Sequence, residues 1–151
     1  VIEEEINYLK IGLFDKKYLS EHQAILGQIN FKNTKPICVM FADQDFDLNN
    51  VEKLIDIGYQ GIMIDTCYKN SKSIVDLLSR EEIKDFLKIV KARNMICGLS
   101  GSLKLKHIAM LKELNPDFLG FRGQLCDPSK ARHKFNINLA QEVSKKIKLS
   151  F

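Results

Sequence analysis

Five short apolar segments alternate with amphipathic segments along the chain, and this alternation constrains the fold more than any other feature. The apolar segments have four to six residues each, which is typical of buried parallel strands; they are residues 8–13, 36–41, 61–64, 95–99 and 118–121. The amphipathic segments predict helices over residues 20–29, 49–57, 79–90, 104–114 and 138–147. The sequence therefore predicts a strand followed by a helix, repeated five times.

Alternating strands and helices predict an α/β fold with a parallel sheet and right-handed crossovers. Two architectures satisfy this pattern: an open doubly wound sheet, and part of a TIM (β/α)8-type barrel. A complete barrel needs roughly 200 or more residues, so five βα units in 151 residues amount to about five-eighths of one. No linker or shift in composition divides the chain. We therefore expect residues 1–151 to form a single partial barrel domain, with the N-terminal βα units absent from this sequence.

Composition and charge exclude several classes of function. The net charge is +4, and the two basic clusters lack interleaved aromatic residues, so we expect no nucleic-acid partner. No run of about 18 apolar residues exists, so we expect no membrane partner. The four cysteines have no short metal-binding spacing and are not expected to form disulfides, which favours a cytoplasmic location. His22, His107 and His133 are not at ligand spacing, and we expect them at the surface.

Lys10 interrupts the first apolar strand and is the first candidate catalytic residue. Side chains alternate along a strand, so Lys10 shares a face with Tyr8 and Gly12, and Gly12 leaves room beside it. A buried ammonium loses its hydration, and amines held in this way act as bases or nucleophiles near neutral pH. We interpret Lys10 as an amine inside the barrel mouth. A lysine paired with an acid in the core, or an edge-strand lysine in water, is the alternative.

Asp65 and Lys69 follow the third strand and form a second candidate group. Asp65 ends the strand, and Lys69 comes four residues later on the loop. A carboxylate and an ammonium this close can pair, and together they can hold or relay a proton. In the alternative, structural interpretation, Asp65 caps a helix and Lys69 is a solvated loop residue.

Two glycine-containing turns follow the fourth and fifth strands, at residues 98–102 and 120–123. Glycines let backbone N–H groups converge on an anion, and the second turn adds a guanidinium. Barrels often bind phosphate with the loops after their last strands. The turns therefore predict phosphate ligands, although tight turns with a structural arginine are the alternative; the candidate residues are Ser100, Gly101, Ser102, Arg122 and Gly123.

Segments 8–13, 64–69, 99–103 and 120–123, in this order and spacing, resemble the (5-formylfuran-3-yl)methyl phosphate synthase (4-HFC-P synthase) family of methanofuran biosynthesis. The resemblance runs from Tyr8 to about Lys146 and corresponds to the C-terminal five-eighths of the family's barrel. Three departures bear on the substrate: Phe14-Asp15-Lys16 replaces the usual Tyr-Gly, residues 41–51 form a shorter segment, and residues 127–133 are altered.

The resemblance implies a lyase that condenses two glyceraldehyde 3-phosphate molecules into a furan aldehyde phosphate, with loss of phosphate and water. The chemistry implied is lysine imine formation with acid/base steps, without a metal or other cofactor. The family's imine-forming lysine lies on an early strand that this sequence lacks. Lys10 matches the family's proton acceptor, and Asp65 and Lys69 match its acid and second lysine near the substrate. The two turns match the region expected to hold the substrate phosphate.

Other functions stay open at this point. The chain could belong to another sugar-phosphate barrel enzyme, such as a class I aldolase or isomerase. It could also be a non-catalytic phosphate-binding barrel fragment, because exposed sheet edges invite association. In each case the expected partner is a small phosphorylated molecule, and a homo-oligomer is a further expectation.

Overall fold

Five parallel strands form the centre of the computed structural model, which describes residues 6–44, 46–68, 72–127 and 134–148. The strands of these residues are β1 (Tyr8–Leu13), β2 (Lys35–Phe41), β3 (Gly61–Asp65), β4 (Ile96–Leu99) and β5 (Phe118–Leu119). They pair in the order β1-β2-β3-β4-β5, each parallel to the next. The expected strand–helix alternation is therefore confirmed.

The helices begin and end at recognisable signals. They are α1 (Leu19–Leu26), α2 (Asn49–Ile57), α3 (Ile74–Leu77), α4 (Arg80–Ala92), α5 (Ile108–Glu113) and α6 (Ile137–Lys148), with short 3-10 helices η1 (Lys16–Tyr18), η2 (Leu105–His107) and η3 (Gly123–Leu125). Ser79 caps α4 by accepting a hydrogen bond from the Glu82 N–H at 3.2 Å, and the Glu82 carboxylate accepts from the Ser79 N–H in return. Gly58 ends α2 in the left-handed conformation, with φ 109°.

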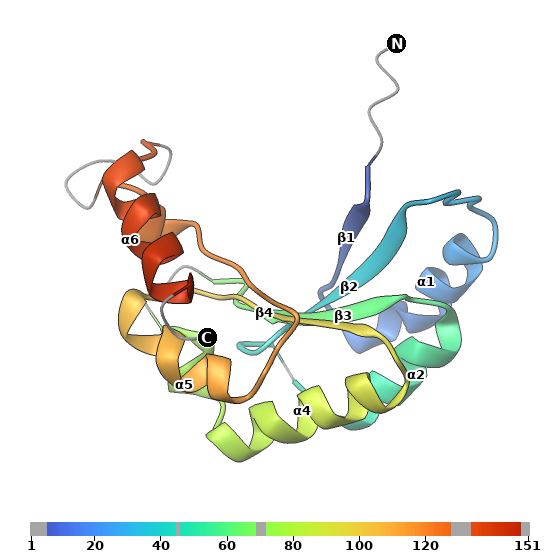
Figure 1. Ribbon diagram of the computed structural model, residues 1–151. Helices are drawn as coiled ribbons and strands as arrows, with labels where there is room; N and C mark the ends of the chain where they lie inside the picture. The colour runs from blue at the N-terminus through green and yellow to red at the C-terminus, as the bar shows by residue number, and fades with distance from the viewer. Residues whose placement is uncertain (1–5, 45, 69–71, 128–133, 149–151) are drawn as a thin grey trace, which may run out of the picture.

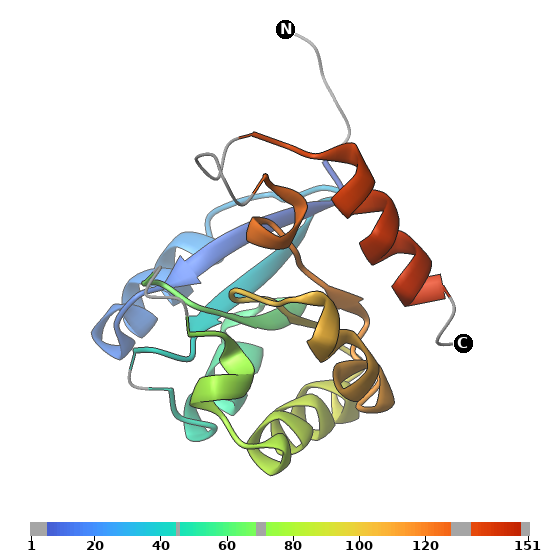
Figure 2. The ribbon, with the colours of Figure 1, turned by 90° about the vertical axis from the view of Figure 1, so that its left-hand side faces the viewer.

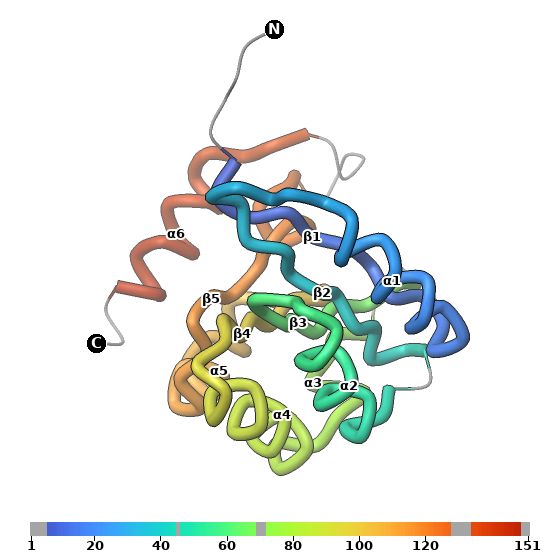
Figure 3. Tube along the Cα trace, turned by 90° about the vertical axis from the view of Figure 1, so that its right-hand side faces the viewer, coloured from blue at the N-terminus to red at the C-terminus, as the bar shows by residue number. Residues whose placement is uncertain are grey.

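The order of the strands decides between the two architectures. A doubly wound sheet reverses its strand order part-way, which places helices on both faces. Here the order never reverses, so right-handed crossovers put the connecting helices on one face. Figure 3 shows the strands following one another in an arc, with α1, α2, α4 and α5 around its outside. The fold is α/β, and the chain supplies five βα units of a TIM (β/α)8-type barrel.

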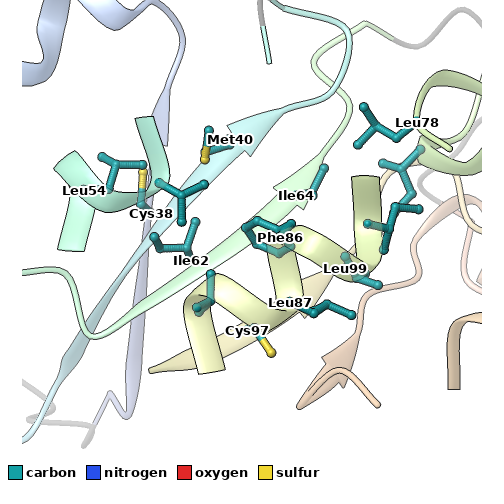
Figure 4. Close-up of a cluster of buried hydrophobic side chains, with 14 of the residues drawn as sticks. Cys38, Met40, Leu54, Ile62, Ile64, Leu78, Phe86, Leu87, Cys97 and Leu99 are labelled. Atoms are coloured by element: carbon teal, nitrogen blue, oxygen red, sulfur yellow. The ribbon is translucent and has the colours of Figure 1, made fainter. Parts of the chain in front are cut away.

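The two faces of the sheet carry different cores. The outer face and the helices enclose the larger one, and Figure 4 shows its side chains gathered between the strands and α4, with Phe86 near the middle. Phe86 is fully buried. The inner face carries a small cluster of Ile37, Val39 and Met63. The helices surround the outer face from α1 to α5 (Figure 1), whereas α6 lies apart from α2 and α4 and contacts η3 (Figure 2).

Several boundaries differ from the sequence prediction. The helix expected over residues 104–114 is divided into η2 and α5, and the four-residue helix α3 was not predicted. β5 has two residues where four were expected. None of the helices in the described ranges is long and apolar enough to cross a membrane.

Truncation of the central aromatic side chain should test the outer core. We expect Phe86→Ala to lower the free energy of unfolding by about 3–5 kcal/mol, because a buried ring is replaced by a cavity. Urea denaturation followed by circular dichroism measures the change.

Lys84 provides the matched control, since it lies on the exposed side of the same helix. Lys84→Ala should leave the denaturation midpoint nearly unchanged. Equal midpoints for the two variants would show that α4 does not cover the sheet as described.

Candidate functional site

A cavity of about 890 Å³ opens at the carboxyl ends of the strands and is the candidate site. Its size falls within the range usual for small-molecule sites. All the predicted site residues that the structure describes line it, namely Lys10, Asp65, Ser100, Gly101, Ser102, Arg122 and Gly123. The structure thus brings together residues from β1, β3 and the loops after β4 and β5. Lys69, the remaining predicted residue, lies outside the described residues.

Lys10 reaches the cavity from low on β1. Its Nζ lies 5.8 Å from the centroid of the Phe118 ring, a cation–π contact that spans from β1 to β5. Through strand pairing Lys10 aligns with Ile37, and Ile37 aligns with Gly61, which is four residues before Asp65. Four residues correspond to about 13 Å of strand. Lys10 therefore begins deeper in the barrel than Asp65, and both residues line the same cavity.

The burial expected for Lys10 is wrong for the described chain. Lys10 is exposed, as are Tyr8 and Leu9 on the same strand. The reason is that β1 pairs with β2 on one side, and among the described residues no strand covers its other side. Burial of the ammonium therefore gives no support to its assignment as a base.

Asp65 stands at the rim of the cavity, and a second carboxylate organises the loop that follows it. The Asp65 Oδ1 accepts a hydrogen bond from the Thr66 N–H at 2.6 Å. Asp43, after β2, accepts from the N–H groups of Cys67 at 2.8 Å and Tyr68 at 2.7 Å. Asp43 thus holds the start of the segment that leads to residue 69. It was not predicted, although it follows a strand end as Asp65 does.

The loop after β4 presents backbone donors to the cavity. The buried Ser100 is tied to the Ile64 carbonyl by its N–H at 2.8 Å. Gly101 and Ser102 then adopt left-handed backbone conformations, with φ 98° and 52°. Within the described part of the chain, the N–H groups of Gly101, Ser102 and Leu103 have no hydrogen-bond acceptor. Three successive donors without an acceptor are the pattern expected of an anion site.

The loop after β5 lies beside the first and adds a guanidinium. The Gly120 N–H donates to the Leu99 carbonyl at 2.8 Å, and the Gln124 Oε1 accepts from the Leu105 N–H at 3.4 Å. These bonds join the two loops. Arg122 and Lys104 both line the cavity, and both are exposed. With Lys10, three cationic side chains face two described carboxylates, those of Asp65 and Asp127, which favours an anionic ligand.

A smaller cavity of about 390 Å³ adjoins the first at the same edge of the sheet. Phe14 and Phe41 line both cavities, and their rings stack with centroids 4.8 Å apart. Asp15 and Lys16, which depart from the family pattern, line the smaller cavity. The first of the three expected departures, at residues 14–16, therefore lies beside the candidate site.

The histidines and cysteines divide between core and site. The surface position expected for His107 is wrong, because this residue is 8% exposed, and His133 lies outside the described residues. All four cysteines are free. Burial raises the pKa of the Cys38 thiol to about 12, whereas Cys67 and Cys126 line the larger cavity. Among the described residues, no group of three or more His, Cys, Asp or Glu side chains could hold a metal ion.

Comparison with known proteins gives the family. The family model described as 4-HFC-P synthase matches residues 1–144. The chain belongs to this family. The resemblance inferred from the four motifs is therefore confirmed over nearly the whole sequence.

Curated relatives of the 4-HFC-P synthase family carry the name (5-formylfuran-3-yl)methyl phosphate synthase. The protein of Methanococcus maripaludis strain C7 is 30% identical over 132 residues, covering 80% of this chain and 56% of that protein. The protein of Methanocaldococcus jannaschii is 30% identical over 156 residues, covering 94% of this chain and 64% of that protein. The chain is homologous to these enzymes, and it spans little more than half the length of the curated relatives it matches.

The backbone also resembles a solved structure. A chain in the crystal structure of the Amycolatopsis orientalis BexX/CysO complex matches with a TM-score of 0.61 and 10% sequence identity. The match covers 96% of this chain and 57% of the other. At this identity the likeness concerns the fold alone.

Substitution of Gly101 should test whether the loop after β4 (residues 100–104) binds an anion. A Cβ at this position would lie 2.7 Å from the Ile74 Cγ2 and 2.8 Å from the Thr66 backbone nitrogen. We expect Gly101→Ala to lower the free energy of unfolding by about 1–3 kcal/mol, because a left-handed residue with a Cβ is strained. We also expect weaker binding of inorganic phosphate, measured by calorimetric titration.

Gly27 offers a control glycine, since its φ is −66° and an added Cβ would lie 3.5 Å or more from its neighbours. Gly27→Ala should bind phosphate as the wild type does. Unchanged phosphate affinity in folded Gly101→Ala protein would show that this loop holds no anion.

Proposed function

We propose that this chain provides five βα units of an enzyme that condenses two glyceraldehyde 3-phosphate molecules into a furan aldehyde phosphate. The reaction would be of the carbon–oxygen lyase type, with loss of phosphate and water. The observation that carries the proposal is one cavity that joins Lys10 and Asp65 to two loops. The loop after β4 offers three successive N–H groups that have no acceptor among the described residues, and the loop after β5 offers Arg122. Membership of the 4-HFC-P synthase family supports the same reaction.

The two loops would hold the phosphate of the substrate. The N–H groups of Gly101 and Ser102 would donate to its oxygens, with the Ser102 hydroxyl nearby. From the neighbouring loop, Arg122 would supply a planar pair of donors and Gly123 a further N–H, while Ser100 anchors the first loop to β3. Binding a phosphate in this way leaves the aldehyde end of a triose directed into the cavity.

Lys10 would accept the proton removed in the enolisation and dehydration steps. It rises from the deeper part of the cavity, whereas the carboxylate of Asp65 stands at the rim. Groups at two depths can act on different atoms of one bound triose. Asp65 and Lys69 would position the substrate and return the proton. Lys69 would act from the loop whose start Asp43 holds.

The imine would form on a lysine outside this sequence. In the proposal, that lysine comes from an early strand of the family's barrel. Its amine would attack the carbonyl carbon and lose water to form the imine, which makes the adjacent C–H acidic. The residues described above would then bind the phosphate, orient the imine and move the proton. No step in this scheme is assigned to a metal or another cofactor.

The remaining expectations stay predictions. They are a single partial barrel domain over residues 1–151, a cytoplasmic location, association into a homo-oligomer, and the absence of nucleic-acid and membrane partners. A phosphorylated aldehyde as substrate follows from the proposed reaction. A class I aldolase, an isomerase and a non-catalytic phosphate-binding fragment are the alternatives that the following experiment separates.

Replacement of Lys10 should test the acid/base role in the complete gene product. We expect Lys10→Met to lower kcat by about 100-fold or more, because a positioned general base contributes roughly that much. Furan aldehyde formation, followed by its ultraviolet absorbance, and phosphate release, followed by a coupled assay, measure the rate with glyceraldehyde 3-phosphate.

Lys35 is the matched control, being an exposed lysine at the start of β2 that lines neither cavity. Lys35→Met should turn over at the wild-type rate. Full activity of folded Lys10→Met would remove Lys10 from the mechanism. Turnover of a ketose phosphate without any furan product would favour the aldolase or isomerase, and phosphate binding without turnover would favour the non-catalytic fragment.

A further inference from the structure

His107 is buried next to the loop after β4, residues 100–104, which is the first proposed anion loop. It ends η2, and its Nδ1 accepts a hydrogen bond from the Lys104 N–H at 3.1 Å. A ring nitrogen that accepts a hydrogen bond carries no proton. In this arrangement the imidazole is therefore neutral, with its proton on Nε2.

The hydrogen bond from Lys104 is one of several that hold the loop, in addition to the bonds from Ser100 to the Ile64 carbonyl. The Ile74 N–H donates to the Gly101 carbonyl at 3.2 Å, and the Leu105 N–H donates to Gln124 at 3.4 Å. Between these points lie the N–H groups of Gly101, Ser102 and Leu103, which have no acceptor among the described residues. Of the side chains and backbone groups that fasten the loop, His107 alone can gain a proton near neutral pH.

Charged groups of both signs lie around the imidazole. Lys104 at the start of η2 and Lys106 within it disfavour the protonated form of His107, whereas Asp76 on α3 favours it. Asp76 is already held by the Ser73 N–H and hydroxyl, both at 2.7 Å. Burial, with Lys106 adding to it, lowers the pKa of His107 below its usual value. The neutral ring is therefore the form that the folded protein favours.

We propose that neutral His107 is a positioning residue for the anion loop, so that oxyanion binding weakens when His107 takes up a proton. A proton on Nδ1 would point at the Lys104 N–H, and two donors cannot bond to each other. The loop would lose this attachment, and the three N–H groups of residues 101–103 would be held less firmly in place. The inference rests on the proposed function, since it concerns the same anion site.

The direction of this effect separates positioning from simple electrostatics. An added positive charge close to the cavity would by itself strengthen anion binding on acidification. Protonation of Asp65 or Asp127 would act in the same sense. Positioning by the neutral ring predicts the opposite, because only the fraction of molecules with an ordered loop binds well.

Sulfate is a suitable probe, because it keeps its charge throughout the range in which histidine titrates. Sulfate is titrated into the isotope-labelled 151-residue chain at several pH values, and the amide signals of residues 101–103 are followed by NMR. One pH unit below the pKa of His107, we expect wild-type affinity to be about tenfold weaker than its neutral-pH value.

Three variants complete the experiment. His107→Asn places an amide oxygen where Nδ1 lies and cannot titrate, so its sulfate affinity should be close to wild type and independent of pH. His107→Ala should bind weakly at every pH. His22→Asn is the matched control: burial also lowers the pKa of His22, but this side chain contacts Tyr59 and lies outside the cavity lining. It should keep the wild-type pH profile.

Several outcomes would overturn the inference. Wild-type affinity that rises or stays constant on acidification would do so, as would loss of affinity in His107→Asn at low pH. The ring ¹⁵N signals of wild-type His107 give a test without any variant: a proton on Nδ1 at neutral pH would exclude the positioning role while leaving the anion site intact. Absence of sulfate binding at every pH would instead overturn the proposed anion site itself, and the role of His107 with it.

Discussion

Parallel pairing of the strands in sequential order is the constraint on which the rest of the structure depends. Pairing sets the register, and the register decides which side chains face the helices and which face the barrel interior. The side chains that point outward from each strand build the outer core around Phe86. The side chains that point inward include Lys10, Asp65 and Ser100, which line one cavity although 90 positions separate the first from the last. The chemistry of the site is therefore a consequence of strand alternation.

Local signals explain how much of the fold the sequence predicts. The bounds of β1 and α2 agree with the prediction, because a short, largely apolar run and a glycine directly after the helix are visible in the sequence. The capping pair of Ser79 and Glu82 marks the start of α4. Helix α3 was missed because four residues are too few to show a helical period. β5 is short because pairing with β4 extends over two residues, a tertiary property that the apolar run does not reveal.

Some features of the candidate site could likewise be predicted from local sequence signals, whereas others depend on the folded chain. The two loops could be predicted because glycines placed directly after strand ends are typical of turns that bind anions. The exposure of Lys10 could not, since it depends on which strands lie beside β1. The burial of His107 depends on packing next to a loop, and nothing in its sequence neighbourhood, with lysines at 104 and 106, indicates an interior position. Asp43 acts on residues 24 and 25 positions away, a distance that only the folded chain closes.

Gly98 and Phe118 face each other across β4 and β5, and the fit between them has a consequence for how this protein can vary. A methyl group on Gly98 would overlap the Phe118 ring, so the ring occupies the volume that any other residue at 98 would need. The two positions can change only together: a larger side chain at position 98 requires a smaller one at position 118. The Lys10 ammonium contacts this same ring. A volume exchange between β4 and β5 would therefore alter the surroundings of the amine without touching any charged residue.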